Sequence, residues 1–168
     1  LARNVLPHVK EINSIVAGIY NLLKKDGFCA IEFHYTGKIL EELHYDSIYH
    51  EHLYYFSINT ISKIFQYYNL YPLDTFKSPI SGGSWVIYFS KSKKEKTKEL
   101  EKHEKQELEN NINSYHRWVE FSSKVAIHSE KLKKVVIKSD KKIPAYGASA
   151  RSSTLLNFCG ITNKHISV

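Results

Sequence analysis

A continuous apolar run directly after an amphipathic helix pattern constrains the fold of this chain more than any other feature. Residues 28–33 are apolar except for Glu32, which is typical of a strand buried on both faces of a parallel sheet. Residues 11–24 repeat apolar side chains with a 3.6-residue period, and Gly27 follows two lysines at the expected helix end. The sequence therefore predicts a helix that leads into a buried strand, which is a building block of α/β folds.

The first 90 residues alternate strand and helix patterns in the order of the second half of a doubly wound sheet. In such sheets, ligands bind outside the carboxyl ends of the strands. In order, the expected elements are a strand within residues 1–9, a helix over 11–24, a strand over 28–33, a long loop over 35–54 with a helical turn at 39–43, a helix capped by Ser57 over 61–68, and strands over 71–76 and 85–90 joined by the turn 81–84.

After residue 90 the pattern becomes helical and strongly charged. Residues 91–111 hold seven Lys and six Glu at helical spacing, which indicates a solvated helix face with weak ion pairs. The helical region, broken once, should end near Lys134. Its buried stripe is expected to consist of Leu108, Ile112, Tyr115 and Val119.

The last part of the chain predicts a strand over 143–146, a turn with Gly147 and a helix over 154–158. Such a helix presents its N-terminus to an anion, and Arg151 lies there. Arg151 either binds a phosphate or caps solvent-facing backbone, and both readings stay open. The G-x-G-x-x-G fingerprint is not met, because Gly147 is the one glycine in this turn.

The net charge of +7 is spread in a way that does not favour nucleic acid as a partner. Most of the excess lies in residues 124–142, and Arg, the usual reader of nucleic acids, is scarce. A phosphorylated small substrate suits this mild charge better. No apolar run is long enough for a membrane span. Cys29 and Cys159 lie far apart in apolar contexts, so we expect two buried thiols in a cytoplasmic protein.

The segment Tyr49-His50-Glu51-His52 joins four side chains that can carry or pass a proton. It follows the second expected strand, and His8 follows the first. Because the carboxyl ends of neighbouring parallel strands meet at one sheet edge, the segment and His8 should face the same crevice. The residues alone therefore indicate an acid–base site.

Several of these residues also have structural interpretations. His8 is also compatible with a turn or helix-cap role, and Tyr49 and Tyr55 with half-buried packing. His50 and His52 as zinc ligands fit neither protease pattern, because the third positions hold Tyr54 and Ile48. Glu32 is also explained as a satisfied polar group at the end of a buried strand.

Several motifs resemble those of the S-adenosylmethionine-dependent sugar C-methyltransferases, which act on nucleotide-linked keto-deoxysugars. The resemblance covers nearly the whole chain. Its motifs are Asn4-Val5-x-x-His8, Leu23-Lys24-x-Asp26-Gly27, Asp46-x-Ile48-Tyr49-His50-Glu51-His52-Leu53-x-Tyr55-Phe56, Gly82-Gly83-Ser84, and Tyr146-Gly147-Ala148 through Thr154-Leu155-Leu156-Asn157-x-Cys159-Gly160. Departures are His34 where the family often has Pro, Ala145 where Gly is common, and Arg151-Ser152 where Lys-Gly is usual.

The resemblance implies a fragment without the N-terminal zinc-binding domain and without the first half of the methyltransferase domain. Residues 1–90 would be the second half of a class I methyltransferase sheet, 91–135 a charged helical connector, and 136–168 the start of a Rossmann-like domain. The main S-adenosylmethionine-binding motif would lie upstream, and the fragment alone should be inactive. Zinc would belong to the missing domain, with none in this segment.

The resemblance also implies roles for single residues. His52 would be the base that removes the C3 proton of a 4-keto sugar, with Glu51 orienting His52 or contacting the sugar. Tyr49 and His8 would donate to the keto oxygen or position the ring. The expected substrate contacts are His50, Tyr35 and Arg151. Open alternatives are a non-catalytic sugar-nucleotide-binding or assembly module, and a methyltransferase for another small acceptor. The residues identify neither the sugar nor the oligomeric state.

Overall fold

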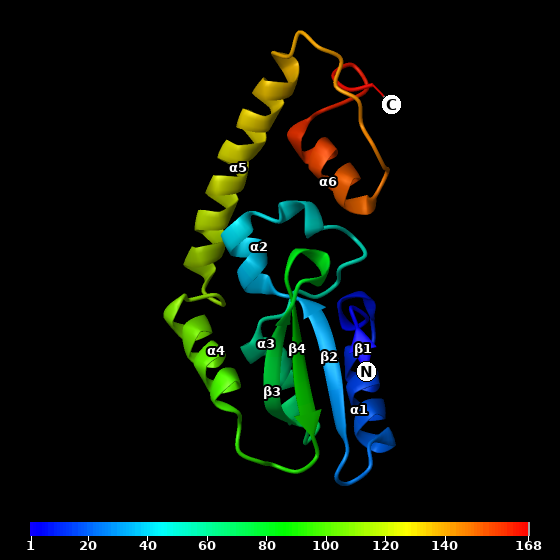
Figure 1. Cartoon of the computed structure of the whole chain (residues 1–168), viewed down its shortest axis with the longest axis vertical. Coiled ribbons are helices and arrows are strands. Elements are labelled where there is room, and N and C mark those ends of the chain that lie inside the picture. The colour runs from blue at the N-terminus through cyan, green and yellow to red at the C-terminus, as the bar shows by residue number, and fades with distance from the viewer. Residues whose placement is uncertain (168) are drawn as a thin grey trace. The chain divides into compact units, whose positions relative to one another are not determined.

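The apolar run becomes β2 (Phe28–His34), an inner strand of a four-stranded sheet in the computed structural model. The sheet order is β1-β2-β4-β3, with β1 over Ala2–Arg3, β3 over Tyr71–Ser78 and β4 over Ser84–Ser90. β1 runs parallel to β2, whereas β4 is antiparallel to both of its neighbours (Figure 1). This order confirms the predicted α/β fold, the second half of a doubly wound sheet.

The structure describes residues 1–167, so Val168, the last residue of the predicted terminal domain, lies outside the described residues. The chain divides into two compact units. Unit 1 comprises residues 1–38 and 51–114, and unit 2 comprises residues 39–50 and the residues from 115 onward. The boundaries predicted at residues 90 and 135 concern the domains of the family, and they stay predictions.

The helices of unit 1 are α1 (Ile12–Leu22), α3 (Ile58–Tyr67) and α4 (Lys98–Glu109). One face of β2 and β4 packs against α1 and α3, and the strands hide part of α3 in Figure 1. Phe65 of α3 stacks on Phe89 of β4 with 4.1 Å between ring centroids, and both side chains are fully buried. Burial of side chains of this size contributes roughly 1.5–3 kcal/mol each. The core therefore fixes the strand ends from which the loops emerge.

The segment between β2 and α3 is more helical than the sequence predicted. The helical turn expected at 39–43 is α2 (Thr36–Glu42), which starts directly after β2, and a short 3-10 turn follows over Tyr45–Ser47. The helix α3 begins at Ile58, not at 61, because the predicted cap Ser57 accepts a hydrogen bond from the Thr60 amide. The Thr60 hydroxyl accepts one from the Ser57 amide in return, which completes a capping box.

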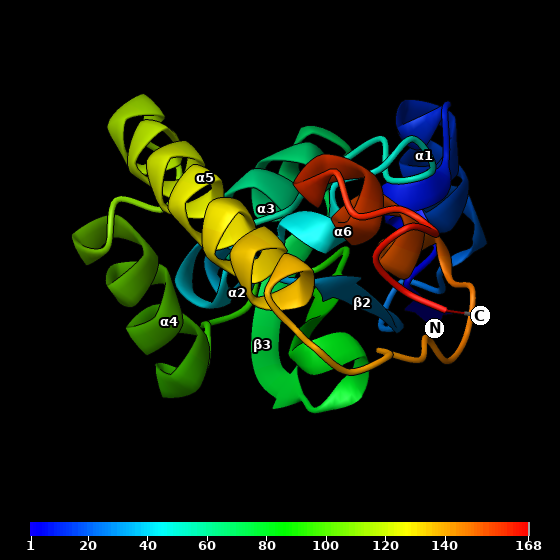
Figure 2. The ribbon, with the colours of Figure 1, turned by 90° about the horizontal axis from the view of Figure 1, so that it is seen from above.

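Unit 2 contains the helices α5 (Tyr115–Ile137) and α6 (Ala150–Cys159), which pack against each other (Figure 2). The 3-10 turn Tyr45–Ser47 packs against α6. Gly160 ends α6 with a φ of 63°, the left-handed conformation that suits glycine at a helix C-terminus.

Three predictions from the sequence are wrong in detail. Of the expected buried stripe after residue 90, Ile112 is buried, but Leu108, Tyr115 and Val119 are exposed. The residues 110–114 break the helix, with Asn111 at a φ of 51°, so side chains on either side do not share one stripe. Residues 143–146 form a single bridge, from Pro144 to Ser167, instead of a strand. The helix predicted over 154–158 begins earlier, at Ala150.

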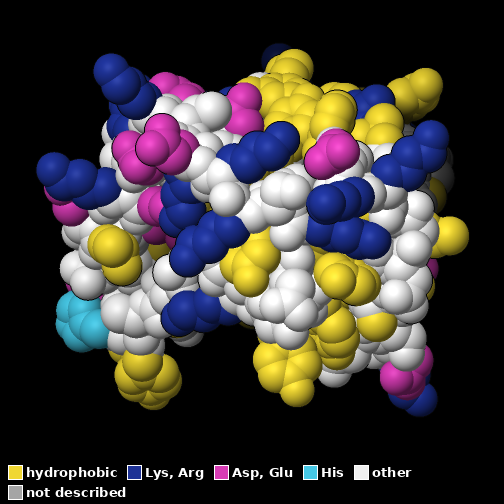
Figure 3. Space-filling view, turned by 90° about the horizontal axis from the view of Figure 1, so that it is seen from below, with side chains coloured by type: hydrophobic (Ala, Val, Ile, Leu, Met, Phe, Trp, Pro, Cys, Tyr) yellow, Lys and Arg dark blue, Asp and Glu magenta, His cyan; other side chains and the backbone are white. Residues whose placement is uncertain are grey.

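The cysteines are buried as predicted, and most charged side chains lie at the surface in mixed surroundings. On the face in Figure 3, Lys and Arg side chains are spread among acidic, apolar and neutral ones. Cys29 and Cys159 are both buried free thiols, as predicted. Burial raises the pKa of the Cys29 thiol to about 11, so it stays protonated at neutral pH. Among the described residues, none of the helices is long and apolar enough to cross a bilayer.

Candidate active site

The turn after β1 and the residues before α3 are joined in unit 1 by main-chain hydrogen bonds. Leu6–His8 form a short 3-10 turn, and the carbonyl of Pro7 accepts hydrogen bonds from the amides of Leu53 (2.8 Å) and Tyr54 (3.3 Å). The hydroxyl of Tyr54 donates to the carbonyl of Lys10 at 3.3 Å. These bonds bring the two parts together as predicted from their places after neighbouring strands.

His8 and His52 meet at this junction. Their ring centroids lie 4.8 Å apart, and Nδ1 of His8 lies 2.9 Å from the carbonyl oxygen of Glu51. Because a carbonyl oxygen only accepts, Nδ1 of His8 must carry the proton of this hydrogen bond. In the neutral ring, Nε2 then holds the lone pair. The contact therefore fixes the tautomer of His8.

The side chains at this junction are accessible enough to meet a ligand. His8 and the side chain of Glu51 are exposed, and His52 is half-buried, with its ring 6.1 Å from that of Tyr55. Glu51 contributes its main-chain carbonyl to the arrangement, while its carboxylate stays at the surface. Two imidazoles at one accessible place are side chains that suit general acid–base chemistry, and the Glu51 carboxylate beside them can accept hydrogen bonds from a ligand.

Two of the four residues in the Tyr-His-Glu-His segment belong to the other unit. Tyr49 and His50 lie in unit 2, where their rings make an edge contact at 6.2 Å. Tyr49 is half-buried and His50 is exposed. The division between the units falls at the peptide bond from His50 to Glu51, and within unit 1 the structure brings Glu51 and His52 together with His8.

Arg151 does not extend alone from the first turn of α6. Its Nε donates to Oδ2 of Asp46 at 2.8 Å within unit 2. Sequence analysis placed Asp46 in the same motif as the proton-handling residues but did not pair it with Arg151. Since the guanidinium has five N–H donors and this contact uses one, a substrate role for Arg151 stays a prediction.

Tyr35, a predicted substrate contact, lies where β2 ends. Its ring centroid is 5.2 Å from that of Trp85, and its backbone pairs with that of Phe56. The ring lies against the backbone of Gly37, where an added Cβ would come within 2.2 Å of a ring carbon. Gly37 therefore has to be glycine while the ring of Tyr35 occupies this place.

Glu107 is a residue of this region that sequence analysis missed. It lies on α4 with 3% of its surface exposed, and its carboxylate oxygens accept hydrogen bonds from the amides of Ile58 and Asn59. The hydroxyl of Tyr35 also bonds to it. Burial raises the pKa of this carboxyl, and the hydrogen bonds counteract part of that rise.

The position of Glu107 on the same helix face as Leu100 would have indicated that its side chain is buried. Leu100, His103 and Glu107, at positions i, i+3 and i+7, form the buried face of α4, so the predicted solvated face does not include them. Exposed ion pairs do form on the helix, such as Lys102 with Glu99 and Lys105 with Glu109. The abundance of Lys and Glu in 91–111 concealed one carboxylate with a buried role.

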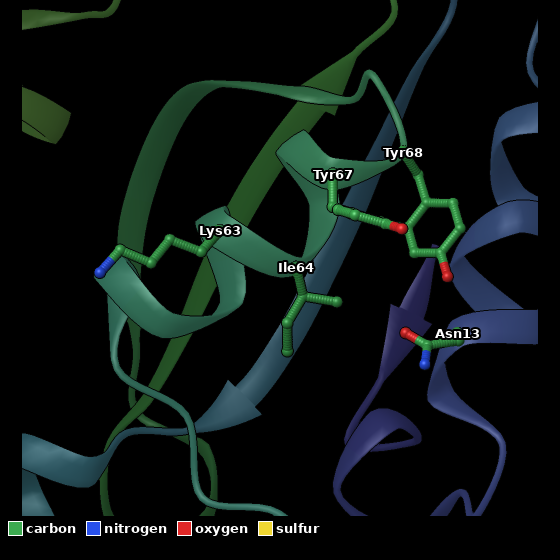
Figure 4. Close-up of a pocket in the computed structure, with 5 residues that line it drawn as sticks. All are labelled: Asn13, Lys63, Ile64, Tyr67 and Tyr68. Atoms are coloured by element: carbon green, nitrogen blue, oxygen red, sulfur yellow. The ribbon is translucent and has the colours of Figure 1, made fainter.

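A separate hollow lies on the outer side of the helices of unit 1. It is lined by Asn13 of α1 and by Lys63, Ile64, Tyr67 and Tyr68 at α3. Figure 4 shows the ring of Tyr68 turned toward Asn13, whereas the amine of Lys63 points away. The candidate acid–base residues do not line it, and we assign it no role.

Within the described residues, His, Cys, Asp and Glu form no cluster of three or more that could hold a metal ion. The turn after β1 and the turn after β2 also lack the repeated glycines that let a backbone approach a nucleotide. We assign none of the described residues to a pocket for the methyl donor.

Comparison with known proteins identifies the family. The family model described as the C-methyltransferase C-terminal domain matches residues 79–168, more than half of the chain. The chain is also 25% identical over 169 residues to the C-methyltransferase NovU of Streptomyces niveus. That alignment covers 98% of the chain, which spans about 40% of the length of this curated relative. The chain therefore belongs to the family of C-methyltransferases that share this C-terminal domain.

Proposed function

We propose that the full-length protein transfers a methyl group from S-adenosylmethionine to C3 of a nucleotide-linked 4-keto-deoxysugar. The family membership supports C-methyl transfer, and the name of the relative from Streptomyces niveus agrees with it. The observation that carries the proposal is the junction of His8, Glu51 and His52, where two imidazoles lie 4.8 Å apart at an accessible place. The sugar and the enolate come from the resemblance of the motifs.

The reaction needs a base that removes a proton from the sugar and a hydrogen-bond donor that stabilises the oxygen of the resulting enolate. A 4-keto group acidifies the neighbouring C3 proton, and a base that removes it leaves an enolate with its charge on the oxygen. The enolate carbon then forms the new bond, and the bond between methyl and sulfur breaks. The methyl donor supplies the electrophilic methyl group.

The residues of unit 1 suit the proton steps. We assign the removal of the C3 proton to His52, and the carboxylate of Glu51 to orienting the sugar. His8, fixed in one tautomer by the Glu51 carbonyl, presents Nε2. Once protonated, Nε2 donates a hydrogen bond to the enolate oxygen. The roles of Tyr49, His50, Tyr35 and Arg151 rest on the resemblance.

Exchange of the C3 proton with deuterated solvent tests the assignment. We expect His52→Asn to reduce exchange by about 10²- to 10⁴-fold, the usual contribution of a general base. Binding of the methyl donor should stay unchanged. His116→Asn is a matched control, because His116 is exposed on α5 in unit 2.

Exchange at the wild-type rate in His52→Asn would remove His52 from the role of base. A folded wild-type protein that binds the nucleotide sugar but neither exchanges its proton nor methylates it would support the non-catalytic binding module instead. Methylation of a different acceptor in a substrate screen would leave the family intact and correct the substrate.

A further inference from the structure

One buried carboxylate lies where the segment between β2 and α3 begins and ends. Tyr35 directly follows β2, and Ser57 caps α3. The backbones of Tyr35 and Phe56 pair there, and the amide of Thr36 donates to the carbonyl of Phe56 at 3.0 Å. Glu107 hydrogen-bonds to the hydroxyl of Tyr35 and to the amide of Ile58, which follows Ser57. We call Tyr35, Phe56, Ser57 and Glu107 the loop base.

Glu107 also completes the hydrogen bonding at the start of α3. The first four amides of a helix have no partner inside the helix. Here the capping box uses the amides of Ser57 and Thr60, and Glu107 accepts from the remaining two, those of Ile58 and Asn59. All four donors are therefore satisfied, and Glu107 alone connects them to another helix.

The residues that lead from the loop base to the candidate base are few. His52 lies four positions before Phe56, and Pro7 holds the amides of Leu53 and Tyr54 between them. The stretch 51–56 is thus fixed at one end by the turn after β1 and at the other by the loop base. A shift of the loop base would move this stretch relative to that turn.

We propose that Glu107 is a positioning residue, which ties both ends of the segment 36–56 together and so sets the geometry of Glu51 and His52. Its catalytic consequence rests on the proposed function, whereas its role as an anchor does not. Glu107 also links two parts of the sequence, because it lies inside the stretch matched by the family model and the segment 36–56 lies outside that stretch.

A carboxylate fits this place better than an amide. Each carboxylate oxygen of Glu107 accepts from its own backbone amide, whereas a Gln side chain replaces one of these oxygens with an NH2 group, which only donates. Hydrogen bonds to a charged acceptor are also stronger than those between neutral groups. Glu107→Gln therefore keeps the size and part of the bonding of the side chain but leaves one backbone donor without an acceptor.

Amide hydrogen exchange of the full-length protein tests the anchor. In Glu107→Gln we expect the amides of Ile58 and Asn59 to exchange about 10- to 100-fold faster, the range for loss of hydrogen bonds to a charged group. Protection of residues 51–56 should fall with them. Glu109→Gln is the matched control, since Glu109 lies on the same helix with 60% of its side chain exposed, and it should change neither.

The anchoring role of Glu107 and its effect on catalysis can be tested separately. If residues 51–56 keep their protection in Glu107→Gln, the anchoring role is wrong, whatever the protein catalyses. If protection falls, kcat for C3 proton exchange should fall about 10- to 100-fold in Glu107→Gln, with a smaller change in the KM of the sugar, as expected for misplacement of a base. An unchanged kcat would overturn the positioning role. A wild-type protein without exchange activity would refute the proposed function and leave the anchor to be judged by protection.

A second variant keeps the test decisive if Glu107→Gln does not fold. Tyr35→Phe removes only the hydroxyl that reaches Glu107 and leaves the carboxylate in its place. We expect faster exchange of the Thr36 amide, whose acceptor is the carbonyl of Phe56. Unchanged exchange at Thr36 would show that Glu107 does not hold the first end of the segment.

Discussion

The two halves of the segment between β2 and α3 are held by different kinds of contact. In unit 2, the half that ends at His50 is held by side chains. The hydroxyl of Tyr45 lies 3.0 Å from Nδ1 of His128 and 3.4 Å from Sγ of Cys159, and Asp46 pairs with Arg151. In unit 1, the half from residue 51 onward is held mainly through backbone amides. These amides donate to the carbonyl of Pro7 and, at the start of α3, to the carboxylate of Glu107.

This difference matters for the candidate active site. Backbone hydrogen bonds do not depend on which side chain a residue carries, so Glu51 and His52 can be replaced without loss of the contacts that place them. The half with Tyr49 and His50 depends on the identity of a few side chains in α5 and α6. Substitutions of the buried side chains around Tyr45 should therefore disturb the structure of unit 2, whereas substitutions of Glu51 or His52 should change the chemistry of unit 1.

The largest expected effect tests the side-chain half. Tyr45 is 5% exposed, and its ring packs against that of Phe158 at 5.2 Å. Tyr45→Ala should destabilise unit 2 by about 3–5 kcal/mol, the usual cost of removing a buried aromatic side chain. Amide hydrogen exchange resolved by residue should show faster exchange in α6 and little change in the β2–β4 pair.

Tyr45→Phe separates packing from hydrogen bonding at the same position. It removes only the hydroxyl, and the expected loss is about 0.5–1.5 kcal/mol. Burial and the neighbouring Cys159 raise the pKa of the Tyr45 hydroxyl, which therefore remains protonated and able to donate. Equal losses in Tyr45→Ala and Tyr45→Phe would show that the ring contributes no packing, contrary to its burial.

The sequence predicted best what the backbone imposes. His8 and the His52 segment were placed together because they follow neighbouring strands, and the bonds to Pro7 bring them together. The buried run at β2 and the cap at Ser57 were also read correctly, since both depend on local pattern. These features need only the order of elements and a few side-chain preferences.

The sequence predicted poorly what depends on partners far along the chain. The pairing of Asp46 with Arg151 joins residues 105 positions apart, and nothing in either local pattern selects it. The burial of Glu107 depends on the amides of α3, 48 and 49 positions away. From the local sequence, a charged residue is predicted to be exposed. Burial of a carboxylate is favourable only when hydrogen-bond donors compensate it, and here those donors lie far away in the sequence.

A smaller effect tests the backbone half through pH. Burial raises the folded-state pKa of Glu107 above the ordinary value of 4.5. A raised folded pKa means that the part of the stability that comes from the pKa shift of Glu107 is fully present below the unfolded pKa and is lost as pH rises through the folded pKa. In denaturant unfolding from pH 4 upward, the difference in unfolding free energy between wild type and Glu107→Gln should therefore decline. A constant difference across this range would contradict the raised pKa.

The smallest expected effect concerns Arg151 and Asp46. Their side chains are 37% and 24% exposed, so solvent screens the pair, and its loss should cost less than about 1 kcal/mol. Asp46→Asn and Arg151→Ala should therefore destabilise unit 2 by similar, salt-dependent amounts. If Arg151 also binds a phosphate of the substrate, only Arg151→Ala should raise the KM of the nucleotide sugar. An unchanged KM in Arg151→Ala would show that Arg151 does not bind the substrate. Its role would then be structural, as the ion-pair partner of Asp46 in unit 2.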